Sequence, residues 1–195
     1  PVTHVAIEDG VLIHFCQSLP AAVGEEVKGA IDFSPRFRNM QNHTAEHIVS
    51  GLVHSLYSYR NVGFHLGKDE VTMDYDGLIT AEQAEELEKR ANEVVYRDLA
   101  VTAKYYTKEE AAALSYRSKI EIAGDIRIVT VPNVDVCACC APHVARTGEI
   151  GIIKLLSAER YKGGTRLHML AGGDARRDYA EKHTVLSQIA ATLSV

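Results

Sequence analysis

The sequence lacks the features that mark membrane, secreted and repeat proteins. Among its 195 residues, no apolar run approaches the roughly 20 residues that a membrane-spanning helix needs. Residues 1–9 mix charged and polar side chains where a secretory signal would be apolar, and repeats and low-complexity tracts are missing. The first residue is Pro1 rather than Met, which is consistent with a start inside a longer gene product. We expect a cytoplasmic globular protein without a membrane partner.

Cysteine and positive charge are also scarce. There are four cysteines, and three of them lie within residues 137–140, which excludes a disulfide scaffold and fits thiols kept reduced in the cytoplasm. The net charge of −5 argues against a protein that binds nucleic acid over its whole surface. Residues 146–166 nevertheless hold five Lys or Arg and two Glu, so this segment is either a local basic patch or an ordinary solvated face.

Apolar periodicity and turn residues predict an α+β fold, with helices packed on a mainly antiparallel sheet. The first thirty-odd residues are expected to form strands of a small antiparallel sheet or barrel, with a turn at Leu19-Pro20. Ser34-Pro35 is expected to break this pattern before a helix that Asn39 or Asn42 caps.

The expected strands are 11–15, 27–33, 63–66, 70–75, 101–106, 125–131, 150–160 and 165–171. In the strand at 70–75 the apolar residues Val71, Met73 and Tyr75 alternate, and Lys162-Gly163-Gly164 predicts a hairpin turn between the last two strands. The expected helices end near residues 59, 98, 114 and 192, and the second begins with a capping box of Thr80 and Gln83. The residues expected to face the core are Ile48, Leu52 and Leu56 on the first helix and Leu87, Ala91, Val94 and Val95 on the second.

Two groups of residues have the chemistry of metal ligands. His43 and His47 are four apart on the first predicted helix, which places both imidazoles on one face, although ordinary surface histidines share this spacing. The second group is the thiol and imidazole cluster of residues 137–143, and this ligand mixture favours zinc. We select Cys139, four residues before His143, while Cys137 is expected to pack inward. The spacing leaves open whether His143 or a water completes the shell.

The same helix offers a competing interpretation. Residues 43–47 also read His-x-x-Glu-His, the pattern of inverted zinc metallopeptidases, in which the Glu is a general base. The cysteine-rich cluster has no place in that arrangement, so the peptidase ranks second. Glu46 is then either a solvated helix residue or a catalytic base.

Several motifs resemble a known family. Asn42-His43-Thr44-Ala45-Glu46-His47, the strand at 125–131, and residues 134–139 through 143–151 resemble the editing domain of alanyl-tRNA synthetase and the free-standing alanyl-tRNA editing proteins. The resemblance runs from about residue 24 to the carboxyl terminus. It implies a partial small β-barrel domain at residues 1–36 and a metal-binding editing domain at residues 37–195. Where the family turn reads Cys-Gly-Gly-Thr-His, this chain has Cys139-Cys140-Ala141-Pro142-His143.

The resemblance also implies an activity and its residues. A member would hydrolyse the ester that joins serine or glycine to tRNA(Ala), with Zn2+ held by His43, His47, Cys139 and His143. Without an adenylation domain the chain is not expected to charge tRNA itself. An alternative is a non-catalytic, zinc-stabilised RNA-binding module.

Catalytic and tRNA-binding candidates complete the predicted site. The resemblance makes the Thr44 hydroxyl a candidate contact for a serine side chain, against the alternative that it bonds its own helix backbone. His65 lines the pocket or is a half-exposed strand residue, and Glu46 is the candidate base. The mischarged tRNA(Ala) would meet basic residues of the segment noted above, namely Arg146, Lys154, Arg160, Lys162 and Arg166.

Overall fold

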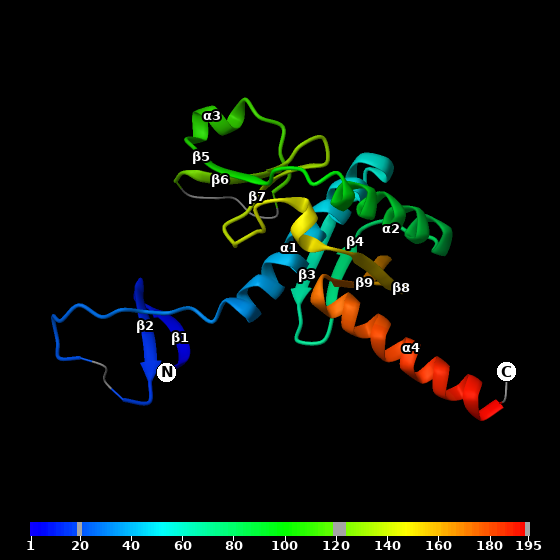
Figure 1. The fold of residues 1–195 in the computed structure, drawn as a ribbon. Helices are drawn as coiled ribbons and strands as arrows, with labels where there is room; N and C mark the ends of the chain where they lie inside the picture. Colours follow the sequence, from blue (N-terminus) through cyan, green and yellow to red (C-terminus); the bar gives the residue numbers. More distant parts are fainter. Residues whose placement is uncertain (19–20, 119–123, 194–195) are drawn as a thin grey trace. The chain divides into compact units, whose positions relative to one another are not determined.

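The computed structural model describes residues 1–18, 21–118 and 124–193, and the chain divides into two compact units, Pro1–Asp32 and Phe33–Val195 (Figure 1). In the first unit β1 (Val2–Glu8) and β2 (Val11–Cys16) form an antiparallel hairpin. The prediction missed β1. The strand expected at 27–33 is wrong: residues 27–32 have no regular structure and Phe33 begins a helix. Within the described chain no strand pairs with that segment to complete a ladder. The turn expected at Leu19-Pro20 lies outside the described residues.

The second unit is a mixed α and β structure, which confirms the predicted α+β class. Its elements are α1 (Phe33–Tyr57), β3 (Asn61–Leu66), β4 (Val71–Tyr75), α2 (Ala81–Tyr96), β5 (Thr102–Tyr106), α3 (Lys108–Ala112), β6 (Ile126–Val131), β7 (Asp135–Ala138), the 3-10 helix η1 (Thr147–Ile150), β8 (Ile153–Tyr161), β9 (Gly164–Ala171) and α4 (Gly173–Leu193). One sheet has the order β3-β4-β9-β8 and the other β5-β6-β7, with antiparallel pairing throughout.

The main core lies between the four-stranded sheet and helices α1 and α2. Strand β4 alternates as predicted, because Val71, Met73 and Tyr75 are buried while Thr72 and Asp74 are partly exposed. Helix α2 carries the predicted capping box, in which Thr80 and Gln83 exchange both bonds. Its expected apolar side, Leu87, Ala91, Val94 and Val95, is buried. Lys162 and Gly163 both have positive φ, and they form the expected tight turn between β8 and β9.

Helix α1 begins earlier than predicted and is more deeply buried. It starts at Phe33, because Pro35 falls in the first turn, where the backbone N–H that proline lacks has no partner within the helix. Asn42 is therefore no cap: it is buried, accepts a bond from the Ala171 backbone at 3.1 Å and donates to Asp174 at 3.2 Å. Ile48 is buried as expected, whereas Leu56 is exposed. From Asn42 to Gly51 only His43 is not fully buried.

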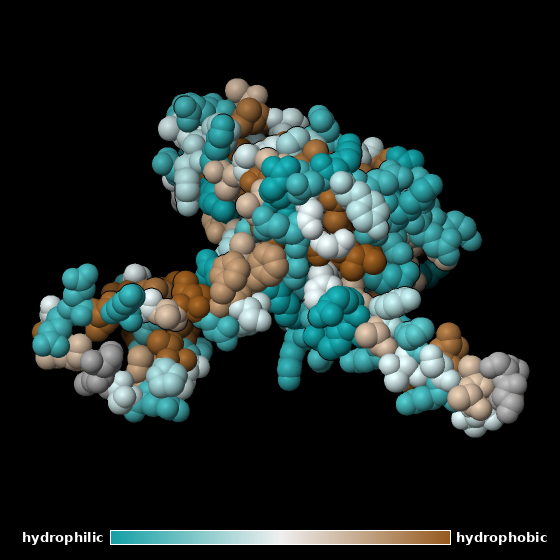
Figure 2. All heavy atoms as spheres, in the orientation of Figure 1, coloured by the Kyte–Doolittle hydropathy of each residue, from teal (hydrophilic) through white to brown (hydrophobic). Residues whose placement is uncertain are grey.

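Helix α4 has the opposite character. Within the described residues it buries only Asp174 and Ala175, and it extends away from the sheet (Figure 1). Apolar side chains show on its distal half in the space-filling view (Figure 2). In the described ranges no helix combines the length and the apolar character that crossing a membrane requires.

Candidate metal centre

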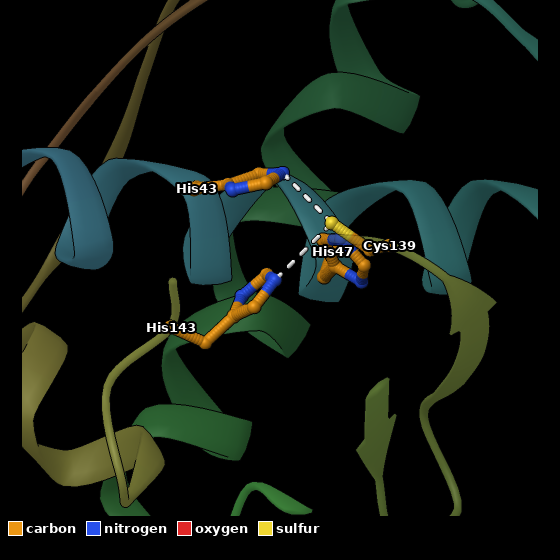
Figure 3. A group of neighbouring side chains, drawn as sticks. All are labelled: His43, His47, Cys139 and His143. Carbon is orange, nitrogen blue, oxygen red and sulfur yellow. Dashed lines mark hydrogen bonds between the residues drawn. The ribbon is translucent and has the colours of Figure 1, made fainter. Parts of the chain in front are cut away.

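The structure brings the four proposed metal ligands together (Figure 3). His43 and His47 project from successive turns of α1, and Cys139 and His143 come from the segment after β7. One ligand atom from each residue lies within 4.8 Å of the others. The Cys139 Sγ is 3.7 Å from His43 Nε2 and 3.5 Å from His143 Nε2. One thiol and three imidazoles therefore surround a space that could hold a metal ion.

Strand β7 and Arg127 position the turn that carries Cys139 and His143. No strand was predicted at residues 135–138, but β7 pairs with β6 and buries Cys137, as expected of an inward-packing thiol. Burial raises the pKa of the Cys137 thiol to about 12, so it stays neutral. Arg127 donates from Nη1 to the Cys139 carbonyl at 2.7 Å and the Ala141 carbonyl at 3.0 Å. A side chain from β6 thus holds the backbone of a turn that lacks the family's glycines.

His47 lies in a chain of charged partners. Its Nδ1 is 2.9 Å from Asp135 Oδ2, and Arg117 donates to both oxygens of Asp135, at 2.7 and 2.9 Å. Burial would raise the pKa of Asp135, but the bonds from His47 and Arg117 outweigh it and lower that pKa. Asp135 therefore stays ionised behind His47. The sequence offered only a charged residue two positions before Cys137 as a signal for this contact.

The Thr44 hydroxyl is fully buried and fully engaged. It donates to the Met40 carbonyl at 2.8 Å, which is the local backbone bond considered as the alternative to substrate contact. The same oxygen accepts from the Val144 backbone at 3.2 Å and lies 3.2 Å from His143 Nδ1. Thr44 consequently connects the helix to the turn.

Burial and the mutual contacts of the side chains set the protonation states of the centre. Burial works to lower the pKa of His47, but bonds to Asp135 and Cys139 outweigh it and raise that pKa to about 9. Burial works to raise the pKa of Cys139, but its bonds with the histidines lower it to about 3. Burial and the neighbouring charges lower the pKa of His143 to about 4. At neutral pH a thiolate therefore faces an imidazolium at His47, and a metal ion that binds there would have to displace that proton.

Glu46 is not a solvated helix residue, as one of its two interpretations expected. Its side chain is buried, and Oε1 accepts bonds from Ser50 at 2.8 Å and Asn61 at 2.7 Å. Its other oxygen lies 3.9 Å from His47 Nε2. Helix α1 is covered on all sides at this point, so the polar side chain of Glu46 is buried as well. The helical period of the sequence alone does not show this.

His65 lies on the exposed side of β3. The neighbouring residue Phe64 faces α1 and stacks on His43, with ring centroids 5.3 Å apart. Because successive strand residues point to opposite faces, His65 points away from His43. The half-exposed strand histidine is thus the better description of this residue.

The five basic residues do not form one patch around the centre. Three hold carboxylates: Arg146 with Asp98, Lys154 with Glu88, and Arg166 with Asp74. Arg166 also lies on the sheet face opposite α1, since its neighbour Leu167 is buried in the core. Arg160 and Lys162 are exposed, and neither forms an ion pair with another described residue.

Two hollows approach the centre from different sides. A hollow of about 360 Å³ opens directly on His43, with Met40, Leu66, Ala141 and Pro142 among its walls. A larger one, of about 690 Å³, is lined by residues that include Asn61, which donates to Glu46, and Asp135, which bonds both His47 and Arg117. In the described chain the walls of the larger hollow do not include the four ligands.

Comparison with known proteins decides the family. Residues 126–168 match the model of the threonyl and alanyl tRNA synthetase second additional domain. An alanyl-tRNA editing protein of Xenopus laevis, Aarsd1-B, is 32% identical over 177 residues, covering 88% of this chain and 43% of that protein. The editing protein AlaX-L of Pyrococcus horikoshii is 36% identical over 135 residues, covering 68% and 33%. The chain belongs to the alanyl-tRNA editing protein family.

The family extends to larger enzymes. The alanine–tRNA ligase of Halobacterium salinarum is 36% identical over 188 residues, which is 92% of this chain and 20% of the ligase. This chain thus spans less than half the length of these relatives. The match to the second additional domain covers the strands around the turn, from β6 to β9, and thus includes Cys139 and His143.

Proposed function

We propose that this member of the alanyl-tRNA editing protein family is a trans-editing hydrolase that removes serine or glycine from mischarged tRNA(Ala). The reaction adds water across the ester, so the bond between the acyl carbon and the ribose oxygen breaks and the free amino acid leaves. The convergence of His43, His47, Cys139 and His143 carries the proposal, because it supplies a reactive centre where the family names an editing activity. The cytoplasm is the proposed location.

The donor set fits zinc. Three imidazoles and one thiolate are borderline-soft ligands, which select zinc over magnesium or calcium. Cys139 has a lowered pKa and offers its thiolate at neutral pH. When bound, zinc would supply a positive charge that orients and polarises the ester. With four protein ligands, positioning the substrate is the favoured role, since catalytic zinc usually keeps a position open.

The hollow at His43 is the proposed entry for the aminoacyl end of the tRNA. Among the centre's residues His43 lines it directly, whereas His47 is buried. Of the three catalytic candidates, Glu46 has the best support, because Oε2 lies near His47 while Ser50 and Asn61 fix the other oxygen. We propose that Glu46 is the general base that accepts the proton lost by the attacking water. Thr44 and His65 have less support, since the Thr44 hydroxyl already donates its one hydrogen to the Met40 carbonyl and His65 points away.

We propose that the five basic residues differ in how readily they contact the tRNA. Arg160 and Lys162 are exposed beside the β8–β9 turn and can bind phosphates directly. Arg146, Lys154 and Arg166 would first have to exchange the carboxylates that they hold. Charge reversal at Lys162 should therefore weaken tRNA binding more than charge reversal at Arg166.

A deacylation assay tests the proposed function. Purified protein with one equivalent of zinc should release serine or glycine from mischarged tRNA(Ala), and His43→Ala or Cys139→Ala should reduce the rate at least about 100-fold. His54→Ala is the matched control, since His54 lies on α1 but is exposed and outside the centre. Glu46→Gln should lower the rate without loss of zinc.

The outcomes separate the alternatives. Zinc-dependent tRNA binding without release of the amino acid would support the RNA-binding module and refute the hydrolase. Cleavage of peptides that depends on Glu46 would support the metallopeptidase. Protein purified without chelators that contains no zinc would remove the basis for the metal centre.

A further inference from the structure

Two of the three histidines in the centre have a hydrogen-bonding partner at Nδ1, the ring nitrogen that does not face the shared space. His143 directs Nε2 toward Cys139 at 3.5 Å, and its Nδ1 lies 3.2 Å from the Thr44 hydroxyl. His47 has Nδ1 at 2.9 Å from Asp135, which leaves Nε2 for the shared space. A neutral imidazole carries one N–H and one lone pair. The partner of Nδ1 therefore decides which nitrogen can bind a metal.

The hydrogen bonds of the Thr44 hydroxyl are compatible with only one tautomer of a neutral His143. The hydroxyl has a single hydrogen, which it donates to the Met40 carbonyl at 2.8 Å. The Val144 N–H donates to the same oxygen, at 3.2 Å. The oxygen can then only accept from His143 Nδ1, so that nitrogen carries the hydrogen and Nε2 keeps its lone pair.

Asp135 imposes the same tautomer on His47 by charge. An ionised carboxylate only accepts, so Nδ1 of His47 must donate to it. Arg117 donates to both carboxylate oxygens from the other side, and its backbone bonds to Val136 and Ala138 fasten it to β7. The carboxylate is thus held rigidly with its negative charge behind the imidazole.

We propose that Thr44 and Asp135 are positioning residues that hold His143 and His47 in the tautomer whose Nε2 faces the metal, with Arg117 holding Asp135. This inference rests on the proposed metal centre and assigns Thr44 a role other than contact with the substrate. A histidine ligand whose second nitrogen donates to an acceptor is oriented and is more basic. The anionic Asp135 should therefore matter more than the neutral Thr44.

Zinc affinity measured by competition with a chromogenic chelator is the first test. Replacing such a partner, by removing its acceptor or its negative charge, costs about 10- to 100-fold in metal affinity. Asp135→Asn should fall toward the upper end and Thr44→Val toward the lower end of that range, whereas Thr44→Ser, which keeps the hydroxyl, should stay within about twofold of the wild type. Asp74→Asn is the matched control, because Asp74 also receives two bonds from an arginine but lies on the outer face of the sheet.

The tautomers are read directly by long-range 1H–15N spectra of histidine-labelled protein, with and without zinc. Wild type loaded with zinc should show Nδ1–H for both His47 and His143. In Thr44→Val the His143 pattern should lose this single form, and in Thr44→Ser it should return. A merely structural role for Thr44 would change the unfolding midpoint but not the tautomer.

The two proposals fail in distinguishable ways. If both Asp135→Asn and Thr44→Val bind zinc within twofold of the wild type, the positioning inference is wrong while the metal centre stands. If the wild type takes up no zinc, the centre and the inference fall together. Should Thr44→Val not fold, Asp135→Asn against Asp74→Asn decides the question alone.

Discussion

Helices α1 and α4 depart in opposite directions from the usual burial of side chains, because α1 buries polar residues and α4 exposes apolar ones. In α1 five polar residues are almost completely buried, namely Asn42, Thr44, Glu46, His47 and Ser50. In α4 five apolar residues are at least half exposed, namely Tyr179, Val185, Leu186, Ile189 and Leu193. Both depart from the usual division between an apolar interior and a polar surface.

The buried polar residues of α1 are explained by the hydrogen bonds of the site, whereas the apolar residues of α4 are simply exposed to solvent. A buried polar group costs about 1–3 kcal/mol unless it is bonded, and each buried polar residue of α1 has a partner on another element. Those partners fix the positions of the ligands. Helix α4 has few such contacts in the described chain, so its exposed apolar side chains carry little of the stability of the unit.

The largest effect in this comparison is expected for Asn42→Leu. The change leaves the Ala171 N–H and the Asp174 carboxylate without their buried partner, which should lower the free energy of unfolding by about 3 kcal/mol. Urea denaturation measures it. Asn39→Leu, on an exposed position of α1, is the control and should stay within about 0.5 kcal/mol. Equal effects of the two changes would contradict the buried network.

Glycines in the two helices should respond with opposite signs. At Gly51 a Cβ would collide with the Val134 carbonyl oxygen and lie 2.8 Å from Asp135 Cβ, so Gly51→Ala should destabilise the protein by about 2 kcal/mol and weaken zinc binding. At Gly173, where α4 begins, a Cβ meets nothing within 4 Å. Gly173→Ala should stabilise by about 0.5 kcal/mol. Thermal unfolding of both variants tests the pair, and a stabilised Gly51→Ala would show that α1 and β7 pack less closely.

The pH dependence of zinc affinity tests the charges buried along α1. Below its pKa of about 9, His47 holds a proton that zinc must displace, whereas Cys139, with a pKa of about 3, is already a thiolate. Affinity should therefore rise about tenfold per pH unit, roughly 1.4 kcal/mol, between about pH 7 and 8.5. Chelator competition at several pH values gives the slope. A slope of two decades per unit would mean that the thiol also loses a proton, contrary to its lowered pKa.

The smallest effect is expected on α4. Leu186→Ser and Ile189→Ser remove exposed apolar side chains and should change the free energy of unfolding by less than about 0.5 kcal/mol each. Leu167→Ala, in the buried face of β9, should cost about 2–5 kcal/mol in the same assay. A large loss at Leu186 would show that α4 is covered in solution, and sedimentation of wild type and variant would then show whether another copy covers it.

Local patterns sufficed for the elements whose formation depends on neighbouring residues. The capping box at Thr80, the alternation of β4 and the turn at Lys162-Gly163 are all of this kind. The start of α1 was wrong because Ser34-Pro35 is compatible both with a break and with a first helical turn. Strand β1 and the absence of a strand at 27–32 depend on which segments pair, and this is not written in either segment alone.

The site shows the same limit. Residue types and spacing indicated His43, His47, Cys139 and His143, and the structure places them together, although metal binding stays a prediction. Asp135, Arg117 and Arg127 were not predicted, because their roles depend on contacts between strands and helix α1 that are distant in sequence. The domain boundary at residue 36, the barrel and the tRNA contacts also stay predictions.

The clamp by Arg127 has a consequence for substitutions in and around the turn. Its guanidinium binds two carbonyls of the turn, those of Cys139 and Ala141, from a strand that precedes the turn by 12 and 14 positions. A loop that is held in this way does not need flexible residues of its own to reach its shape. We therefore expect a substitution of Arg127 to displace Cys139 and His143 more than a substitution of Cys140 does.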